Sequence, residues 1–286
     1  MKILSFGEIL WDVYPDESYI GGAPLNFAAH LKKHGEEVYM LSALGEDSLG
    51  ERARHVLEEW GINVEYVSVL KDKETGKCLV TLDENSLPSY NLLYDVAYDF
   101  IDSGVVTENF DVLYFGTLAL RSVGNLNSIK ALLEKGVFGE VFVDVNIRPP
   151  FYSKESVELA INNATILKVS LEELYEVASL LDMKESEDYK AFAKELKKKN
   201  PWLKCIIITL GADGAYALEH GEYYCPAEKA CVVSTVGAGD SFSASFLHKY
   251  LKGNNVKDCL KYASRVAGFV VSHSAAVPDY NVEDFN

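Results

Sequence analysis

Two patterns of apolar residues alternate along this chain. Short runs rich in β-branched or aromatic residues are typical of strands buried in a parallel sheet. Apolar residues repeated every three or four positions are typical of amphipathic helices. The short runs are Lys2–Gly7, Val38–Ala43, Asp111–Phe115, Glu140–Val145, Thr165–Val169 and Lys204–Thr209. The helical stretches are Pro24–Gly35, Leu49–Trp60, Leu126–Lys135, Lys154–Asn163, Leu171–Leu181, Tyr189–Lys199, Ala238–Leu251 and Lys257–His273. This alternation predicts an α/β fold with a mostly parallel central sheet and helices on both faces.

One region interrupts the alternation. Residues 62–95 contain three strand-like segments without a helix between them, Val64–Val69, Lys77–Leu82 and Ser89–Tyr94. Asp12–Ile20, an extended stretch after the first strand, is a candidate fourth member. We expect a small antiparallel sheet, a β lid at about 12–20 and 62–98, inserted into a single domain that spans residues 1–286.

Three tyrosines end this region, Tyr90, Tyr94 and Tyr98. They could line the face of a lid over a polar ligand, or they could simply pack against the rest of the protein. On the first interpretation, Tyr94 is a candidate contact of the substrate.

The net charge of the chain argues against two classes of binding partner. The chain has 286 residues, with 27 basic and 43 acidic side chains and a net charge of −16. A field of that sign repels nucleic acid and anionic membranes, so we expect neither as a partner. An anionic ligand must instead be held by local donors, such as backbone N–H groups or a suitably placed arginine.

The five cysteines indicate a reducing compartment. They form no CxxC pair, and most lie in apolar runs, as Cys205 does before three isoleucines. This is typical of buried, reduced thiols rather than of disulfides or a zinc site. The chain begins without a signal-peptide pattern, and no apolar run reaches the roughly 18 residues of a membrane span, so we expect a soluble cytoplasmic protein.

Two histidines are candidate metal ligands. His30 and His34 stand four residues apart and could face one ion. No third ligand accompanies them and lysines lie between, so we interpret both as surface histidines.

The strongest signal for chemistry is Ser234–Phe242, which reads Ser-Thr-Val-Gly-Ala-Gly-Asp-Ser-Phe. Small residues at a strand-to-helix turn let consecutive N–H groups point at an anion, and the helix dipole favours its charge. Asp240, in the first helical turn, would then stand beside a bound phosphate as a base, as phosphoryl transfer to an alcohol requires. The alternative is a tight turn in which Asp240 only stabilises the start of the helix.

Two other nucleotide motifs are absent from the sequence. There is no GxxxxGK[ST], and GxGxxG fails after Gly237 and Gly239 because Phe242 stands in place of the third glycine. The second absence weakens the case for a Rossmann-type dehydrogenase.

Weaker motifs point to a polar ligand. Gly21–Ala29 carries a glycine pair before a helix that begins with proline, and Asn26 within it could bind the hydroxyls of a polyol together with Asp12. On its own, this motif favours a plain turn and helix. Thr209–Gly214 follows a strand and could pass under a nucleotide or form a plain hairpin.

A further polar cluster, Asp144–Arg148, lies at the C-terminal end of a predicted strand, where open α/β sheets bind ligands. Strand alternation would put Asp144, Asn146 and Arg148 on one side. Arg148 is then a candidate phosphate clamp.

These pieces, in this order, resemble the ribokinase-like (PfkB) sugar kinases over nearly the whole chain. The motifs that carry the resemblance are Gly21–Ala29, Gly45–Gly50 and Val236–Phe242, while Gly7–Asp12, Asp144–Arg148 and Lys168–Glu173 are similar to the fructokinase and ketodeoxygluconate kinase branch. The resemblance implies a sugar kinase that uses ATP and Mg²⁺, with fructose as the first choice of substrate and a homodimer formed through the lid. Ketodeoxygluconate, ribose and a nucleoside are the alternatives within the family. A catalytically silent sugar-binding regulator is the alternative from another class, and the intact GAGD sequence argues against it.

The resemblance also implies roles for individual residues. Asp240 would be the base, and the N–H groups of Gly237, Ala238 and Gly239 would contribute to the anion hole. The sugar or the transferred phosphate would be contacted by Asp12, Gly22, Asn26 and Arg148, and the nucleotide by Ser170, Thr209, Gly211 and Gly214. Glu173 would order magnesium through water.

One departure from the family pattern concerns a monovalent cation. The tail Val271–Pro278 is similar to the family's segment beside the adenine and this cation, but Ser234 replaces the aspartate that usually precedes Thr235. A desolvated cation needs a counter-charge. We therefore predict weak or absent activation by potassium, with the turn held by its own hydrogen bonds.

Overall fold

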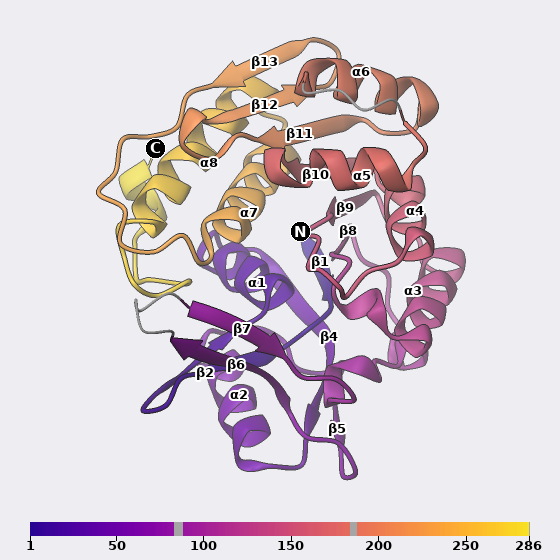
Figure 1. The fold of residues 1–286 in the computed structure, drawn as a ribbon, viewed down its shortest axis with the longest axis vertical. Helices are drawn as coiled ribbons and strands as arrows, with labels where there is room; N and C mark the ends of the chain where they lie inside the picture. Colours follow the sequence, from indigo (N-terminus) through magenta and orange to yellow (C-terminus); the bar gives the residue numbers. More distant parts are fainter. Residues whose placement is uncertain (83–87, 184–187, 286) are drawn as a thin grey trace.

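A nine-stranded sheet runs through the computed structural model, which describes residues 1–82, 88–183 and 188–285 (Figure 1). The strands lie in the order β13-β12-β11-β10-β9-β8-β1-β4-β5. The parallel strands are β1 (Lys2–Phe6), β4 (Glu37–Gly45), β5 (Val67–Leu70), β8 (Val112–Phe115), β9 (Glu140–Asp144), β10 (Ile166–Ser170) and β11 (Cys205–Thr209), and the antiparallel edge strands are β12 (Ala215–Leu218) and β13 (Glu222–Cys225). The predicted mostly parallel sheet is confirmed.

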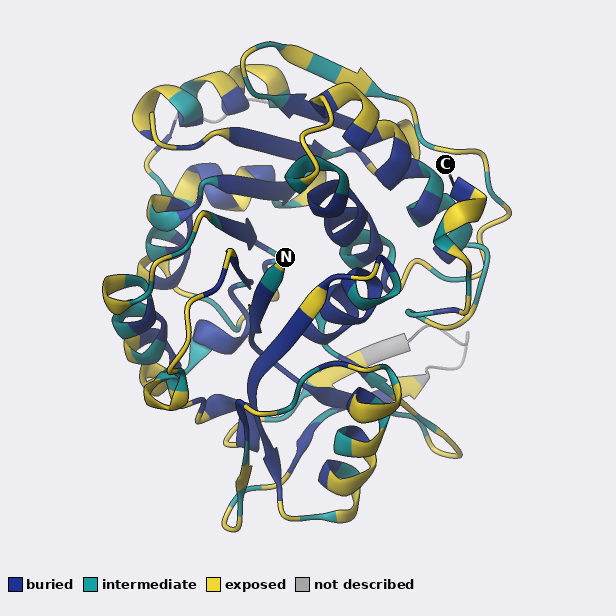
Figure 2. Cartoon of the chain, turned by 180° about the vertical axis from the view of Figure 1, so that it is seen from behind, coloured by how far each residue is buried: buried dark blue, intermediate teal, exposed yellow. Residues whose placement is uncertain are grey.

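Helices cover both faces of this sheet. One face carries α1 (Ala23–Lys33), α2 (Ser48–Glu59), α7 (Ala238–Leu251) and α8 (Val256–Val270), and the other carries α3 (Val123–Lys135), α4 (Lys154–Asn163), α5 (Leu174–Leu180) and α6 (Tyr189–Lys199). Strand β8 shows how the two cores arise, because Leu113 and Phe115 lie in one core while Val112 and Tyr114 lie in the other. Figure 2 shows the result, with buried strands between helices whose outer sides are exposed.

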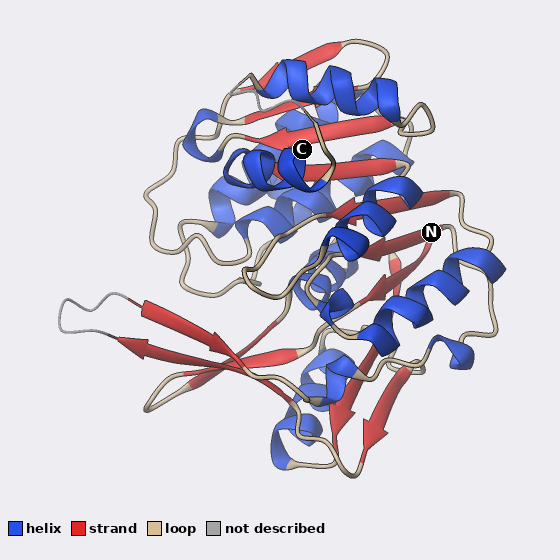
Figure 3. Ribbon diagram, turned by 45° about the vertical axis from the view of Figure 1, so that its right-hand side comes forward, coloured by secondary structure: helices blue, strands red, loops and turns tan. Residues whose placement is uncertain are grey.

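The smaller sheet is built from β3, β2, β6 and β7 in that order. Its strands are β2 (Leu10–Val13), β3 (Ser18–Gly21), β6 (Gly76–Leu82) and β7 (Pro88–Leu92). The outer pairs are antiparallel, whereas β2 and β6 run parallel. In Figure 3 this sheet extends away from the body of the molecule.

One strand was assigned to the wrong sheet, and two edge strands were missed. Val64–Val69, predicted for the lid, lies instead at the edge of the large sheet, where β5 pairs with β4. The hairpin interpretation of Thr209–Gly214 is confirmed, because this segment connects β11 to the antiparallel strand β12. Strands β12 and β13 were not predicted, because each is only four residues long and exposed residues alternate with half-buried ones in β13.

The expected exposure of several side chains also needs correction. His30 and His34 are not surface residues: they are 0% and 7% exposed, because α7, α8 and the C-terminal segment cover α1. All five cysteines are free, but Cys231 is exposed and Cys225 is partly so. Among the helices that the structure describes, none has the length and apolar character needed to cross a membrane.

Candidate active site

The carboxyl ends of the parallel strands meet at one edge of the sheet, which is where ligands bind in open α/β folds. Glu8 follows β1 after a single glycine, Asp144 ends β9 and Ser170 ends β10. Helix α7 begins at the same edge, with Gly239 against the Lys168 side chain of β10. The site is therefore assembled from chain segments that are far apart in sequence.

The turn before α7 has a geometry that only glycine tolerates. Gly237 is the N-cap, with a φ of 78°, and a Cβ there would lie 2.4 Å from the carbonyl oxygen of Ala276. The first intrahelical bond runs from Ser241 N–H to the Gly237 carbonyl at 2.9 Å. The N–H groups of Gly239 and Asp240 precede that bond and face outward at the positive end of the helix dipole, a setting that attracts anions.

Asp240 is joined to the glycine-rich motif at the other end of the chain. Asn26 Nδ2 donates to Asp240 Oδ2 at 2.8 Å across 214 positions of sequence. Burial raises the pKa of Asp240 to about 6, while the bond from Asn26 acts to lower it. Asn26 Oδ1 is buried and has no hydrogen-bond partner in the described part of the chain, so it can accept from a ligand.

A buried ion pair that the sequence analysis missed lies behind the turn. Lys168 Nζ donates to both carboxylate oxygens of Asp144, at 2.9 and 2.8 Å, and Ser243 Oγ donates to the same carboxylate at 3.2 Å. Lys168 Nζ lies 3.4 Å from the position that a Cβ on Gly239 would take. Burial acts to lower the pKa of Lys168, but attraction to Asp144 and other carboxylates outweighs it and raises the pKa. A lone lysine inside the apolar run of β10 was the signal that could have found it.

Glu8 is the second residue that was missed. The residue is 3% exposed, and Glu8 Oε1 accepts from the Ala23 N–H at 3.3 Å. Burial raises the pKa of Glu8 to about 7, with Asp240 acting to raise it and Arg148 to lower it. Gly22 is required here, because its φ is 116° and a Cβ would lie 2.3 Å from the Glu8 carbonyl oxygen.

Arg148 follows β9 and acts on this centre through its charge. The predicted alternation fails after Asp144, because β9 ends there and Asn146 has a φ of 45°. Arg148 is exposed on the following loop, yet its charge acts on Glu8 and Asp240.

Asp12 lies on the lid, opposite Cys78 of β6. Burial raises the pKa of Asp12, and a hydrogen bond with the Cys78 thiol acts to lower it. The charge of Arg148 also reaches Cys78. The charge of Arg148 therefore acts on the small sheet as well as on Glu8 and Asp240.

The three lid tyrosines do not form one face. Tyr98 is fully buried, whereas Tyr90 and Tyr94 are 55% and 62% exposed. Tyr94 packs over the guanidinium of Arg121, which pairs with Asp99 at 2.7 Å. The ring of Tyr94 also lies 4.9 Å from that of Phe151, so its described contacts are with Arg121 and Phe151.

The residues predicted for the nucleotide lie at the ends of β10 and β11. Ser170 and Thr209 are opposite each other in the ladder, and a Cβ on Gly214 would lie 2.1 Å from the Cys225 carbonyl oxygen. Glu173 accepts from the N–H groups of Ile147 at 2.5 Å and Ser170 at 2.7 Å. Burial raises the pKa of Glu173. Each of its oxygens keeps lone pairs that suit a contact through water.

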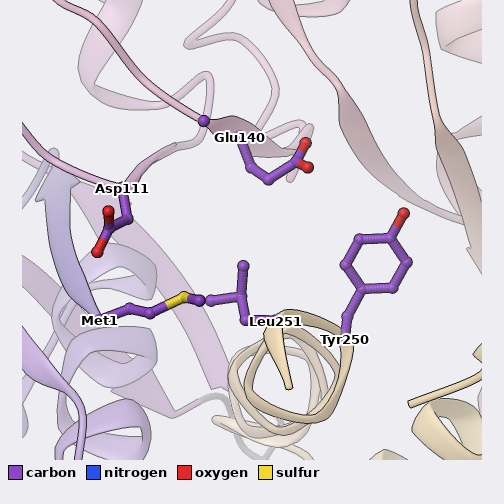
Figure 4. A pocket seen from close by; sticks show the side chains of 6 residues that line it. Met1, Asp111, Glu140, Tyr250 and Leu251 are labelled. Carbon is purple, nitrogen blue, oxygen red and sulfur yellow. The ribbon is translucent and has the colours of Figure 1, made fainter. Parts of the chain in front are cut away.

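A pocket of about 330 Å³ lies at the opposite edge of the sheet and is not a candidate (Figure 4). Its lining residues are Met1, Asp111, Gly139, Glu140, Tyr250 and Leu251. Asp111 accepts from the Lys2 N–H, and Glu140 accepts from Lys204 and Thr165. Both carboxylates are thus occupied by the protein itself. No group of three or more metal-ligating side chains occurs among the described residues.

Comparisons with known proteins agree with this geometry. The family model described as pfkB family carbohydrate kinase matches residues 5–281. The chain is 25% identical to the probable fructokinase-5 of Arabidopsis thaliana, over 96% of this chain and 93% of that protein. It is 29% identical to the 5-dehydro-2-deoxygluconokinase of Shouchella clausii, over 90% and 82%. The crystal structure of aminoimidazole riboside kinase from Salmonella enterica, solved with its riboside and an ATP analogue, has the same fold, with a TM-score of 0.83, 22% identity and coverage of 100% and 99%. This chain belongs to the pfkB family of carbohydrate kinases and is a sugar kinase.

Proposed function

We propose that this kinase transfers the γ-phosphate of ATP to a hydroxyl of a neutral sugar, with fructose as the first choice. The observation that carries the proposal is the contact between Asp240 and Asn26 at the start of α7. With a pKa of about 6, Asp240 is mostly ionised at pH 7 and basic enough to accept the proton of a hydroxyl as it attacks phosphorus. Asn26, held by Asp240 through Nδ2, offers Oδ1 to the sugar.

The phosphoryl group would be received by the turn before α7. The N–H groups from Gly237 to Asp240 are the proposed anion hole, although Ala238 N–H also reaches the Thr235 carbonyl at 3.3 Å. Fixed donors of this kind stabilise charge as it develops and need no rearrangement during the reaction. Arg148 would draw the transferred group toward the acceptor hydroxyl.

The charges around Asp240 favour a neutral sugar over a sugar acid. Glu8, Asp12 and Asp240 contribute carboxyl groups, whereas Arg148 is the one cation we assign to the substrate, since Lys168 is paired with Asp144. A ketodeoxygluconate carboxylate would add a further negative charge to this group. Asp12, Gly22 and Asn26 suit the hydroxyls of a polyol, and Tyr94 is proposed to act only when the lid closes.

ATP and magnesium are proposed to occupy the ends of β10 and β11. Ser170, Thr209, Gly211 and Gly214 would contact the nucleotide, and Glu173 would hold magnesium through water, because both its oxygens already accept backbone N–H groups. When bound, magnesium supplies charge neutralisation on the phosphates. The fructokinase of Vibrio cholerae, solved with fructose, ADP and calcium, supports this combination of ligands for the fold.

We also propose where the enzyme acts and how it assembles. Five free cysteines and the use of ATP fit the reducing cytoplasm. Exposed Tyr19 and Tyr90 on the lid are suited to contact with a second copy of the chain. Sedimentation at increasing protein concentration tests the dimer.

The substrate is tested by measuring ATP turnover against fructose, ketodeoxygluconate, ribose and a nucleoside, with phosphorus NMR of the product. We expect the highest kcat/KM with fructose. A higher value with the sugar acid would contradict the charge argument. Turnover with none of them would favour the silent sugar-binding regulator.

A further inference from the structure

Two side chains of helix α1 connect it to the turn before α7, one directly and one through the C-terminal segment. Asn26 donates directly to Asp240, and His30, one helical turn later, contacts the C-terminal segment. His30 is fully buried, with Nε2 3.0 Å from the Ala276 carbonyl oxygen and Nδ1 2.7 Å from the Tyr280 hydroxyl. A carbonyl oxygen can only accept, so Nε2 carries the proton and donates while Nδ1 accepts from Tyr280. Burial lowers the pKa of His30 to about 4, which keeps this neutral form at physiological pH.

The C-terminal segment that His30 contacts packs directly against the turn before α7. Ala276 is the residue that a Cβ on Gly237 would strike, with its carbonyl oxygen at 2.4 Å and its Cα at 2.7 Å. Earlier in the same segment, the Val271 carbonyl accepts from the N–H groups of Val233 at 2.8 Å and Ser234 at 3.2 Å. The position of the turn therefore depends on the position of residues 271–280.

We propose that His30 is a positioning residue for the phosphate-binding turn: by fixing the Ala276 carbonyl against Gly237, it sets the direction in which the N–H groups before α7 point. The proposal rests on the proposed function of that turn. Without the bond from Nε2, the segment can move away from Gly237, and the donors lose the alignment on which stabilisation of the transferred group depends.

His34 provides a matched control on the same helix. It lies one turn further on, is 7% exposed, and bonds Ser245 Oγ of α7 at 3.0 Å and the Tyr262 hydroxyl of α8 at 3.4 Å. Its ring stacks on His248 at 4.6 Å. Both hydrogen bonds of His34 are made to residues within α7 and α8, and neither is made to Ala276. A loss of packing would therefore be shared by variants at both histidines, whereas a loss of alignment would be confined to His30.

The test compares His30→Leu, His30→Gln and His34→Leu in the full-length enzyme. His30→Leu should lower kcat by roughly 10- to 100-fold, less than the ~10²–10³ for deleting an anion-hole donor outright, with the KM for sugar within about threefold. His30→Gln keeps an N–H near the place of Nε2 and should recover most of kcat. His34→Leu should keep kcat within about threefold of the wild-type value, even if its Tm falls as far as that of His30→Leu. Equal losses of kcat at both positions, or no loss in His30→Leu, would overturn the proposal.

A second readout needs no substrate and separates this proposal from the proposed function. Hydrogen exchange of the amides of residues 234–241 should be faster in His30→Leu than in the wild type, and unchanged in His34→Leu. If His30→Leu does not fold, Tyr280→Phe, which removes the second hydrogen bond between His30 and this segment, should also give faster exchange. Unchanged exchange in both would overturn the proposal. Faster exchange in an enzyme that phosphorylates no sugar would support the positioning role and reject the function.

Discussion

Replacing Lys168 with methionine would leave Asp144 as an unpaired buried carboxylate behind the phosphate-binding turn. The side chains of Lys168 and Asp144 are 7% and 3% exposed, so water cannot compensate for the loss. Breaking a buried ion pair by removing one partner costs about 3–5 kcal/mol, and in a chain of this size each kcal/mol lowers Tm by about 2–3 °C. We therefore expect Lys168→Met to melt roughly 6–15 °C below the wild type.

The same substitution should change the pH dependence of catalysis. Asp144 acts to raise the pKa of Asp240 and Lys168 acts to lower it. Without Lys168, the pKa of Asp240 rises, and the acidic limb of the kcat profile moves to higher pH.

The double variant Lys168→Met/Asp144→Asn separates an unpaired charge from lost packing. It contains neither charge, and the asparagine can still accept from Ser243, so it should regain at least half of the lost Tm and move the acidic limb back. Thermal denaturation and initial rates from pH 5 to 9 measure both effects. A single variant within about 2 °C of the wild type, with an unshifted limb, would refute the reasoning.

Three further predictions follow from the site. Because Asp240 must be ionised to act as a base and burial raises its pKa to about 6, kcat should be level above that pH and fall about tenfold per unit below it, and a level profile down to pH 5 would contradict this role. Asp12→Asn and Tyr94→Ala should raise the KM for sugar more than the KM for ATP, whereas equal effects on both would count against placing the sugar beneath the lid. Ser234 supplies no counter-charge for a cation, and its Oγ accepts from the Val236 N–H at 3.2 Å, so kcat should be nearly equal in potassium and in a bulky organic cation at matched ionic strength. Several-fold stimulation by potassium would show this to be wrong, and Ser234→Asp should increase the dependence on potassium.

Much of the fold was predictable because most of its strands are buried on both faces. Continuous apolar runs mark such strands, and helices Lys154–Asn163, Tyr189–Lys199 and Ala238–Leu251 have the bounds that their periodicity predicts. The segment around β5 was assigned to the wrong sheet, because its short alternating pattern fits the edge of either sheet. Pairing partners are a tertiary property that the pattern does not encode.

The candidate site was predictable where the residues of a short motif dictate the local backbone conformation. The turn before α7 was found from its glycines, and Asp240 and Asn26 from their places in two motifs. Lys168 and Glu8 were missed, because each is a single charged residue in an apolar run and becomes meaningful only beside Asp144 or Asp240. His30 was misplaced at the surface for a related reason: every residue of α1 from Pro24 to Leu31 is buried, so the helix has no solvent-facing stripe there.

The central claim is that Asp240 removes the proton from the acceptor hydroxyl, and Asp240→Asn tests it most directly. Asparagine keeps the shape of the side chain but cannot take a proton. With fructose or whichever sugar the panel identifies, we expect kcat to fall by ~10²–10⁴ while ATP binding, measured by calorimetry, is unchanged. An Asp240→Asn enzyme that retains kcat within a few-fold of the wild type would contradict the account.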